Sequence, residues 1–426
     1  MKRSEALVVN DVRLQDTKPC KSVFTINKLQ ILTWVALVIA AMLRLSFPED
    51  IEYKGDEKFM FAQSQSVGVT IPWPSLGMTS SIHFRNPAVS IWLFVGLARL
   101  FHLTDPVALT RCVECLNISA FFLLFWVVQK ILPVEERREP WMWALILAAC
   151  NPFAILFQRK LWAQDTLPFF CVALLAGWFK RETILGAFAW GFFGAILGQI
   201  HMSGFFLAAS LWLFTVLLAP RFSVYRQIHW PAWLLGSALA IIPLIPWIQY
   251  AINFRGAVHG VYWSNMLPIK YWFYWLTDAL GFCLNFSLGH HFKEFIQIPW
   301  VAAAHLLIGL AAAAIFYFAI RRWIKGPNLS FRGESMLALA SAGIGCGILM
   351  AIARVPVHRY YLITTFPFEF YWLACLACDD GIRGQRLLAL IALCELVVSI
   401  SFLFFIHAHH GAPSANYGIG YQWQKL

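Results

Sequence analysis

The sequence predicts an all-α membrane protein, a polytopic bundle of about eleven transmembrane helices. Of its 426 residues, 60% are hydrophobic and 13% are charged, whereas a soluble domain has roughly 25% charged residues. Several apolar segments also reach the roughly 17–25 residues that a helix needs to cross the hydrocarbon of a bilayer. Helices satisfy their backbone hydrogen bonds internally, which that environment requires.

The predicted spans follow the apolar runs, at 31–47, 107–130, 141–158, 166–180, 184–200, 203–219, 231–249, 299–320, 336–353, 362–378 and 387–407. The net charge of +11 comes mainly from loops that such spans would leave on one side. These loops hold 19 of the 33 Lys and Arg residues, in 1–30, 130–140, 180–183, 220–229, 321–335 and 379–386. Basic loops mark the cytosolic side. We therefore expect a cytosolic N-terminus, the plasma (inner) membrane if the organism is bacterial, and no nucleic-acid partner.

This topology divides the chain into four parts. They are a cytosolic basic tail (1–30), a membrane module (31–249) that includes an outer loop (48–106), an outer aromatic-rich loop (250–298), and C-terminal membrane helices with a short outer tail (299–426). Within the outer loop, residues 87–102 are apolar but short for a span, so we expect a helix lying along the outer membrane surface. Counting this segment as a span would invert every later loop.

Polar side chains near the spans converge on the outer side of the predicted bundle. They are Arg44, Asp56, Glu57, His83, Arg85, Arg159, Lys160, Asp165, Gln199, His201, His358, Arg359 and Tyr360. Polar groups in or near spans are costly and tend to be functional. A carboxylate within reach of a hydroxyl or amine can act as a general base, and Arg or Lys can stabilise a departing phosphate. The pattern predicts group transfer at the membrane boundary.

Each of these residues also has a structural interpretation. Arg44, Arg159 and Arg359 could be interface anchors whose side chains reach the headgroups. The pair Asp56-Glu57 could be a solvated loop or could cap a helix, and Asp165 could cap the helix that follows it. His201 and His358 could be ordinary polar residues at helix ends.

The polar residues, in their order along the chain, resemble the membrane-embedded GT-C glycosyltransferases, particularly protein O-mannosyltransferases and lipid A aminoarabinose transferases. Asp56-Glu57 matches an Asp-Glu pair in the first outer loop of those enzymes. The remaining matches are His83-Phe84-Arg85-Asn86-Pro87 for a His/Lys-Pro-Pro motif, Ala108-Leu109-Thr110-Arg111 for an Ala-Leu-Arg phrase, Arg159 with Asp165, and Arg359-Tyr360. One proline of the Pro-Pro pair is absent, and Arg85 stands where the aminoarabinose enzymes have lysine.

The resemblance implies a GT-C-like fold and the transfer of a sugar from a polyprenyl-phosphate carrier to an acceptor protein, glycolipid or polysaccharide on the outer face. It implies a catalytic set of Asp56 as the base, Glu57 as its helper, and Asp165. Arg85, Arg159, Lys160 and Arg359 would face the lipid phosphate. The other substrate-binding residues would be Arg44, His83, Gln199, His201, His358 and Tyr360. The chain has no Gly-rich loop ending in Lys-Ser/Thr for a nucleotide donor.

The sequence leaves the cofactor unknown. A divalent metal ion held by acidic residues such as Asp56 and Asp165 is one alternative that the sequence leaves open. A zinc site is not indicated, because no histidine pair has the spacing of zinc ligands. The alternative functions are a transporter or flippase for a lipid-linked or anionic substrate and a structural membrane subunit. A transporter would line a pathway through the midplane with polar groups and show related halves, which the chain does not.

Overall fold

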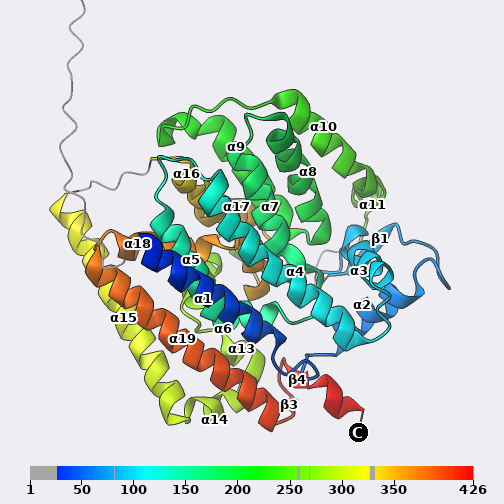
Figure 1. The fold of residues 1–426 in the computed structure, drawn as a ribbon. Helices are drawn as coiled ribbons and strands as arrows, with labels where there is room; N and C mark the ends of the chain where they lie inside the picture. Colours follow the sequence, from blue (N-terminus) through cyan, green and yellow to red (C-terminus); the bar gives the residue numbers. More distant parts are fainter. Residues whose placement is uncertain (1–25, 81, 257–259, 268, 327–331, 426) are drawn as a thin grey trace, which may run out of the picture.

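The computed structural model describes residues 26–80, 82–256, 260–267, 269–326 and 332–425 (Figure 1). Regular structure in these residues is almost entirely helical, which confirms the predicted all-α fold. The predicted cytosolic tail 1–30 lies outside the described residues except for its last five.

Helices follow one another along most of the described chain. They are α1 (Ile26–Leu45), α2 (Gly55–Ser66), α3 (Val89–Leu100), α4 (Pro106–Trp126), α5 (Arg138–Cys150), α6 (Pro152–Phe157), α7 (Leu167–Phe179), α8 (Ile184–Ile200), α9 (Ser203–Leu217), α10 (Trp230–Ile241), α11 (Ile245–Asn253), α12 (Ile269–Ala279), α13 (Leu284–Leu288), α14 (Phe292–Ile296), α15 (Pro299–Lys325), α16 (Glu334–Ala340), α17 (Cys346–Ile352), α18 (Phe368–Cys378) and α19 (Ile382–Ala408). The strands form two antiparallel pairs, β1 (Leu76–Thr79) with β2 (Arg85–Pro87) and β3 (Gly411–Ala412) with β4 (Gly418–Ile419).

Six helical segments of the described chain are long and apolar enough to cross a bilayer. They are Lys28–Leu45, Pro106–Ile131, Trp230–Asn253, Pro299–Lys325, Glu334–Ile352 and Ile382–Ala408. A seventh results if the 3₁₀ segment Arg359–Thr365 and α18, bent by 71° where they meet, count as one span. The other four predicted spans are the shorter helices α7, α8 and α9 and the pair α5–α6. All eleven predicted segments are helical, but fewer than eleven have full crossing length.

Prolines explain why two predicted spans are interrupted. Pro152 separates α5 from α6, and Pro367 separates the 3₁₀ segment Arg359–Thr365 from α18. Proline lacks the N–H that a helix interior needs, and its ring clashes with the preceding turn. The Asn151 side chain restarts the helix by accepting hydrogen bonds from the N–H groups of Phe153 (2.9 Å) and Ala154 (3.2 Å). Hydropathy alone does not detect such breaks.

The core lies around α5, whose residues from Pro140 to Cys150 are all buried. Helices α1, α18 and α19 pack against α5. A helix that is apolar on every side is expected in the interior of a bundle, and α5 occupies that place.

The C-terminal ends of α1 and α19 meet at one end of the bundle (Figure 1). The Phe47 ring stacks on His407 with centroids 4.4 Å apart, and His407 Nδ1 lies 2.7 Å from Asp50 Oδ2. Because the first and last long helices end together, the two ends of the described chain lie on opposite sides of the bundle. An odd number of crossings, as in the predicted topology, has this consequence.

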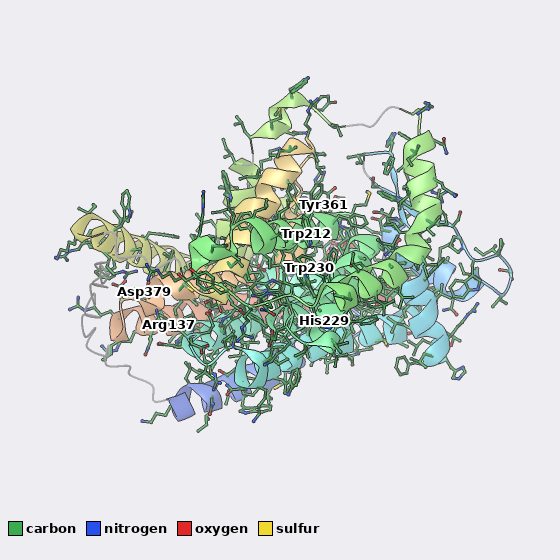
Figure 2. All side chains as sticks on the ribbon, turned by 90° about the horizontal axis from the view of Figure 1, so that it is seen from above. Arg137, Trp212, His229, Trp230, Tyr361 and Asp379 are labelled. Carbon is green, nitrogen blue, oxygen red and sulfur yellow. The ribbon has the colours of Figure 1, made fainter. Side chains whose placement is uncertain are left out.

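The loops predicted to be cytosolic gather at the opposite end of the bundle. Arg137 and Asp379, labelled in Figure 2, form an ion pair of 2.6 Å between two of these loops. Arg181, fully buried, pairs with Glu334 at 2.9 Å, and Arg226 lies 3.0 Å from the same carboxylate. The predicted grouping of these loops is therefore confirmed, while the side of the membrane on which they lie stays a prediction.

Helix α3 does not cross the bundle. Near its start, Trp92 Nε1 donates to the Pro74 carbonyl at 3.0 Å, and beyond its end the Leu103 carbonyl accepts from Gln65 at 3.0 Å. The start of α3 thus contacts the segment between α2 and β1, and the residues just beyond its end contact α2. The helix predicted at 87–102 is found here as α3, packed against α2, while its position at the outer membrane surface stays a prediction.

Candidate active site

The candidate site is centred on the buried Lys160, in the connection between α6 and α7. Its ammonium forms an ion pair with Glu52, and Glu52 also pairs with Lys54 at 2.8 Å. The ammonium lies 4.9 Å from the Phe157 ring and 4.8 Å from the Trp162 ring, within the range of cation–π attraction. We call Lys160 with Glu52, Asp56, Glu57 and Asp165 the Lys160 cluster.

Glu57, in the first turn of α2, is fully buried. One of its oxygens accepts a hydrogen bond from the Lys54 N–H at 3.1 Å, so Glu57 satisfies one of the free donors at the start of the helix. The other oxygen has no hydrogen-bond partner among the described residues. Burial, reinforced by the charge of Glu52 and opposed by Lys160, raises the pKa of Glu57 to about 7. Glu57 therefore caps α2, as the structural interpretation predicted, and it does so as a buried carboxyl with a raised pKa.

Asp56, its neighbour, is exposed on α2. Partial burial raises the pKa of its carboxyl above the ordinary value, Lys54 and Lys160 oppose that rise, and Glu52 adds to it. A carboxylate that is accessible and somewhat more basic than usual is suited to accept a proton. Asp56 thus lies at the open side of the Lys160 cluster.

Asp165 lies on the buried side of the same cluster. It belongs to the 3₁₀ turn Ala163–Thr166 that leads into α7, and neither of its oxygens has a hydrogen-bond partner in the described part of the chain. It therefore does not cap α7. Lys160, Glu57 and Glu52 are the charged groups that act on it. A buried polar group without a partner is rare and calls for an explanation.

Two of the predicted substrate-binding arginines are engaged by the protein itself. The buried Arg44 donates to the Gln158 side chain (2.5 Å) and to the carbonyls of Ala40, Ala148 and Ala149. Arg159 donates to the carbonyls of Ser46 (2.6 Å) and Phe47 (3.0 Å) and lies 3.5 Å from Glu114. Both guanidinium groups hold α1 against neighbouring helices. That either arginine contacts a substrate stays a prediction. The hydrogen bonds just described argue against it, because they already engage both guanidinium groups.

Arg85 lies at a different place, on the exposed β1–β2 hairpin. Its Nε donates to the Gly77 carbonyl at 3.1 Å, and its own carbonyl accepts from Trp247 Nε1 at 2.7 Å. His83, at the tip of the hairpin, is exposed and has a φ of 61°. The Phe84 ring between them packs against Trp247, Tyr250 and Phe254 in and just after α11. This hairpin leaves the Arg85 side chain accessible.

The remaining predicted residues lie on α8 and in the segment before α18. Gln199 is buried and joins α8 to α10 by donating to the Ala240 carbonyl at 2.6 Å. His201 Nδ1 lies 2.7 Å from the Ser203 hydroxyl, and its ring is 5.3 Å from that of Tyr361. Gln199 is thus a packing residue, whereas His201 belongs to an aromatic wall.

This aromatic wall continues through residues 358–361. His358 stacks on Tyr360 with centroids 5.3 Å apart, and Tyr360 meets Trp162 edge-on at 5.4 Å. Because Trp162 also contacts the Lys160 ammonium, the wall borders the Lys160 cluster. Arg359 points elsewhere, into an ion pair with Asp278 and over the Tyr274 ring at 4.8 Å. The structure brings Asp56, Glu57, Lys160 and Asp165 together, with His201, His358 and Tyr360 beside them.

Several residues of the site have no marker in the sequence. Glu52 precedes the Asp-Glu pair without any motif, and Asp278 lies in a segment whose aromatic residues predict a membrane anchor. Glu114 lies within α4, where it accepts from Arg111 at 3.2 Å. A carboxylate in an apolar helix is the one signal that could have identified Glu114.

The divalent metal ion considered from the sequence stays untested. The described residues contain no group of three or more His, Cys, Asp or Glu side chains placed to bind an ion. The Lys160 ammonium occupies the middle of the acidic cluster, where it supplies the positive charge.

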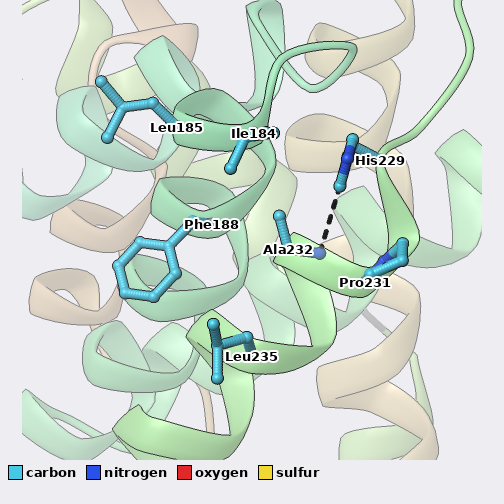
Figure 3. Close-up of a pocket in the computed structure, with 7 residues that line it drawn as sticks. All are labelled: Ile184, Leu185, Phe188, His229, Pro231, Ala232 and Leu235. Carbon is cyan, nitrogen blue, oxygen red and sulfur yellow. Dashed lines mark hydrogen bonds between the residues drawn. The ribbon is translucent and has the colours of Figure 1, made fainter.

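An apolar pocket of about 460 Å³ lies between α8 and α10, away from this cluster (Figure 3). It is lined by Ile184, Leu185, Phe188, His229, Pro231, Ala232 and Leu235. The His229 ring Nδ1 caps α10 by accepting from the Ala232 N–H at 3.3 Å, and the His229 backbone N–H donates to the Arg181 carbonyl at 3.0 Å. The pocket is therefore at the end of the bundle that holds Arg181, and its walls offer no charged group for chemistry.

No protein-family model matches the sequence, and no curated protein is similar to it in sequence. Among solved structures, the chain is similar to the oligosaccharyltransferase of Archaeoglobus fulgidus, which was crystallised with a tethered acceptor peptide. The TM-score is 0.47 and the sequence identity is 12%. The alignment covers 93% of this chain and 56% of the other, so the chain spans little more than half the length of that protein.

Proposed function

We propose that this protein is a glycosyltransferase of the GT-C type that moves a sugar from a polyprenyl-phosphate carrier to an acceptor at the outer face of the membrane. The observation that supports this most is the Lys160 cluster, where an accessible carboxylate, Asp56, adjoins a buried cation at one end of a membrane bundle. The order of the motifs along the sequence supports the same assignment.

The proposed reaction uses Asp56 as the general base. Asp56 takes the proton from the acceptor hydroxyl or amine, whose oxygen or nitrogen forms a bond to the anomeric carbon of the sugar. The bond between that carbon and the phosphate oxygen breaks, and polyprenyl phosphate leaves with the electron pair. Its negative charge is what cations at the site would stabilise. Inversion at the anomeric carbon is the outcome that the family resemblance implies.

The structure favours some cations over others for the phosphate. Arg85 is exposed, with its Nε on the Gly77 carbonyl, whereas Arg44 and Arg159 are buried and bound to several backbone carbonyls. Arg359 and Lys160 would first have to leave Asp278 and Glu52. We therefore assign direct contact with the phosphate to Arg85 and only an electrostatic contribution to Lys160. We assign the sugar to the wall of His358, Tyr360 and Trp162, whose ring faces suit stacking on a pyranose.

A transporter or flippase is the alternative. It is favoured by carboxylates deep in the bundle, because the fully buried Glu395 of α19 and Glu369 of α18 would suit a polar pathway. Glu395, however, is 2.8 Å from the Asn151 amide that caps α6, which gives it a structural role. A flippase would move the lipid-linked sugar without consuming it.

The test is to incubate the purified protein with a panel of polyprenyl-phosphate sugars and acceptors and to measure the release of polyprenyl phosphate. Replacement of Asp56 by Asn should lower the rate by on the order of 10²-fold or more. The control is Asp105→Asn, because Asp105 caps α4 and asparagine caps equally well. No consumption of any donor by the wild-type protein, or equal rates for Asp56→Asn and the control, would contradict the proposal.

A further inference from the structure

The C-terminal tail, residues 409–425, packs along the loop that leads from α1 to the proposed base. Tyr421 N–H donates to the Ile51 carbonyl at 3.0 Å and Gln422 N–H to the Glu49 carbonyl at 3.1 Å. Glu52 pairs with Gly420 in an antiparallel bridge. The tail thus adds to this loop as an extra strand would, and backbone groups of both segments satisfy each other.

Side chains reinforce the same contact. Asp50, which is buried, receives hydrogen bonds from the Gln422 side chain on its carboxylate and from the Tyr417 hydroxyl on its carbonyl. Gln424 donates to the Tyr53 carbonyl at 2.7 Å, and the Lys54 ammonium donates to the Asn416 carbonyl. Every residue from 49 to 54 therefore has a partner in the tail.

We propose that the C-terminal tail positions the loop that holds Glu52 and Asp56, and that Gln422 and Asp50 are positioning residues for the transfer reaction. This inference rests on the proposed function for its effect on catalysis, though not for the contact itself. Outside the tail, this loop is also held by His407 of α19 at Asp50 and by Lys160 at Glu52. Glu52 meets Lys160 only while this loop holds its path.

Misplacement of the loop has a defined electrostatic consequence. The charged groups that act on Asp56 are Lys54, Lys160 and Glu52, with Glu57 next to it in sequence. Burial raises the pKa of Asp56 most, and the carboxylate of Glu52 adds to that rise. If Glu52 leaves Lys160, this added contribution is lost and the opposing cation is unmasked. The pKa of Asp56 should then fall.

The test replaces Gln422 by Glu, which sets two carboxylates against each other at Asp50. The expected result is a kcat lower by on the order of 10-fold, with little change in KM, and an acid limb of the pH–rate profile at lower pH. The matched control is Gln297→Glu, the same change at an exposed position at the end of α14. The double variant Asp50→Asn with Gln422→Glu restores one donor and one acceptor, so it should recover the wild-type rate and limb.

Hydrogen exchange provides a second measurement that does not depend on the proposed function. In Gln422→Glu, the backbone amides of residues 421 and 422 and those of residues 49–58 should exchange faster, while amides in the middle of α5 keep their wild-type rates. Unchanged exchange at these positions would overturn the positioning proposal even if the enzyme transfers sugar. Faster exchange without any shift of the acid limb or of kcat would overturn the catalytic part of it. A wild-type protein inactive on every donor would instead refute the proposed function.

Discussion

The replacement of Glu57 by glutamine tests the electrostatics of the Lys160 cluster through stability. Burial raises the pKa of Glu57 from 4.5 to about 7 in the folded protein, whereas the unfolded chain keeps the ordinary value. The folded state therefore binds this proton more tightly, and ionisation opposes folding as the pH rises from about 4.5 to 7. At 1.36 kcal/mol per pKa unit, this difference corresponds to about 3 kcal/mol of stability lost by the wild type above pH 7.

Glutamine cannot ionise, so the variant should escape this loss. Its free energy of unfolding relative to wild type should increase by up to about 3 kcal/mol between pH 4.5 and pH 8. The side-chain oxygen of glutamine can still accept from the Lys54 N–H, so the start of α2 keeps its hydrogen bond. Any effect of the substitution on packing is the same at every pH and cancels in the comparison.

The assay is thermal unfolding of the detergent-solubilised protein, followed by tryptophan fluorescence at pH 5 and at pH 8 with one heating rate. The difference in Tm between Glu57→Gln and wild type should be more positive at pH 8 by on the order of 5 °C. Glu49→Gln is the control, because Glu49 is exposed on the same loop. A difference in Tm that is equal at the two pH values would refute the claim that Glu57 is a buried acid.

Three further predictions follow from contacts in the structure. Lys160→Met removes the buried cation that pairs with Glu52 and faces Asp165, and it should lower stability at pH 7 by about 3–5 kcal/mol, measured as the loss of Tm; a variant as stable as wild type would contradict the ion pair. Arg159→Ala should lower Tm and leave the KM for the donor close to the wild-type value, because the hydrogen bonds of Arg159 go to Ser46 and Phe47. A large increase in KM at unchanged Tm would show phosphate binding instead. A tag after the C-terminal tail should be accessible from the side opposite to a cysteine introduced at Glu135; labelling of both from one side would contradict the odd number of crossings.

The large-scale arrangement was predictable because hydropathy and charge act over whole segments. The all-α bundle, the separate short helix α3 and the common end shared by Arg137, Asp379 and Glu334 all follow from where apolar runs and basic loops alternate. The number of full-length spans did not follow. Asn151-Pro152 and Pro367 interrupt apolar runs that average hydropathy treats as continuous.

Which arginine faces a substrate was not predictable from the sequence. Arg44 and Arg159 stand at ends of apolar segments, as Arg359 does, yet the direction of a long side chain depends on its tertiary neighbours. The carbonyls that bind Arg159 come from residues more than 110 positions earlier in the chain. The contacts between the C-terminal tail and the loop at 49–54 join residues more than 360 positions apart and have no sequence motif. Local patterns contain no information about such pairs.

The most direct test of the proposed mechanism is the pH dependence of polyprenyl-phosphate release under single-turnover conditions. If Asp56 is the base, the wild-type rate should rise with pH through a limb that lies above the ordinary aspartate pKa of 3.8, because the pKa of Asp56 is raised. Asp56→Asn should lose that limb together with most of the rate. A variant that keeps both the limb and the rate would show that another group accepts the proton.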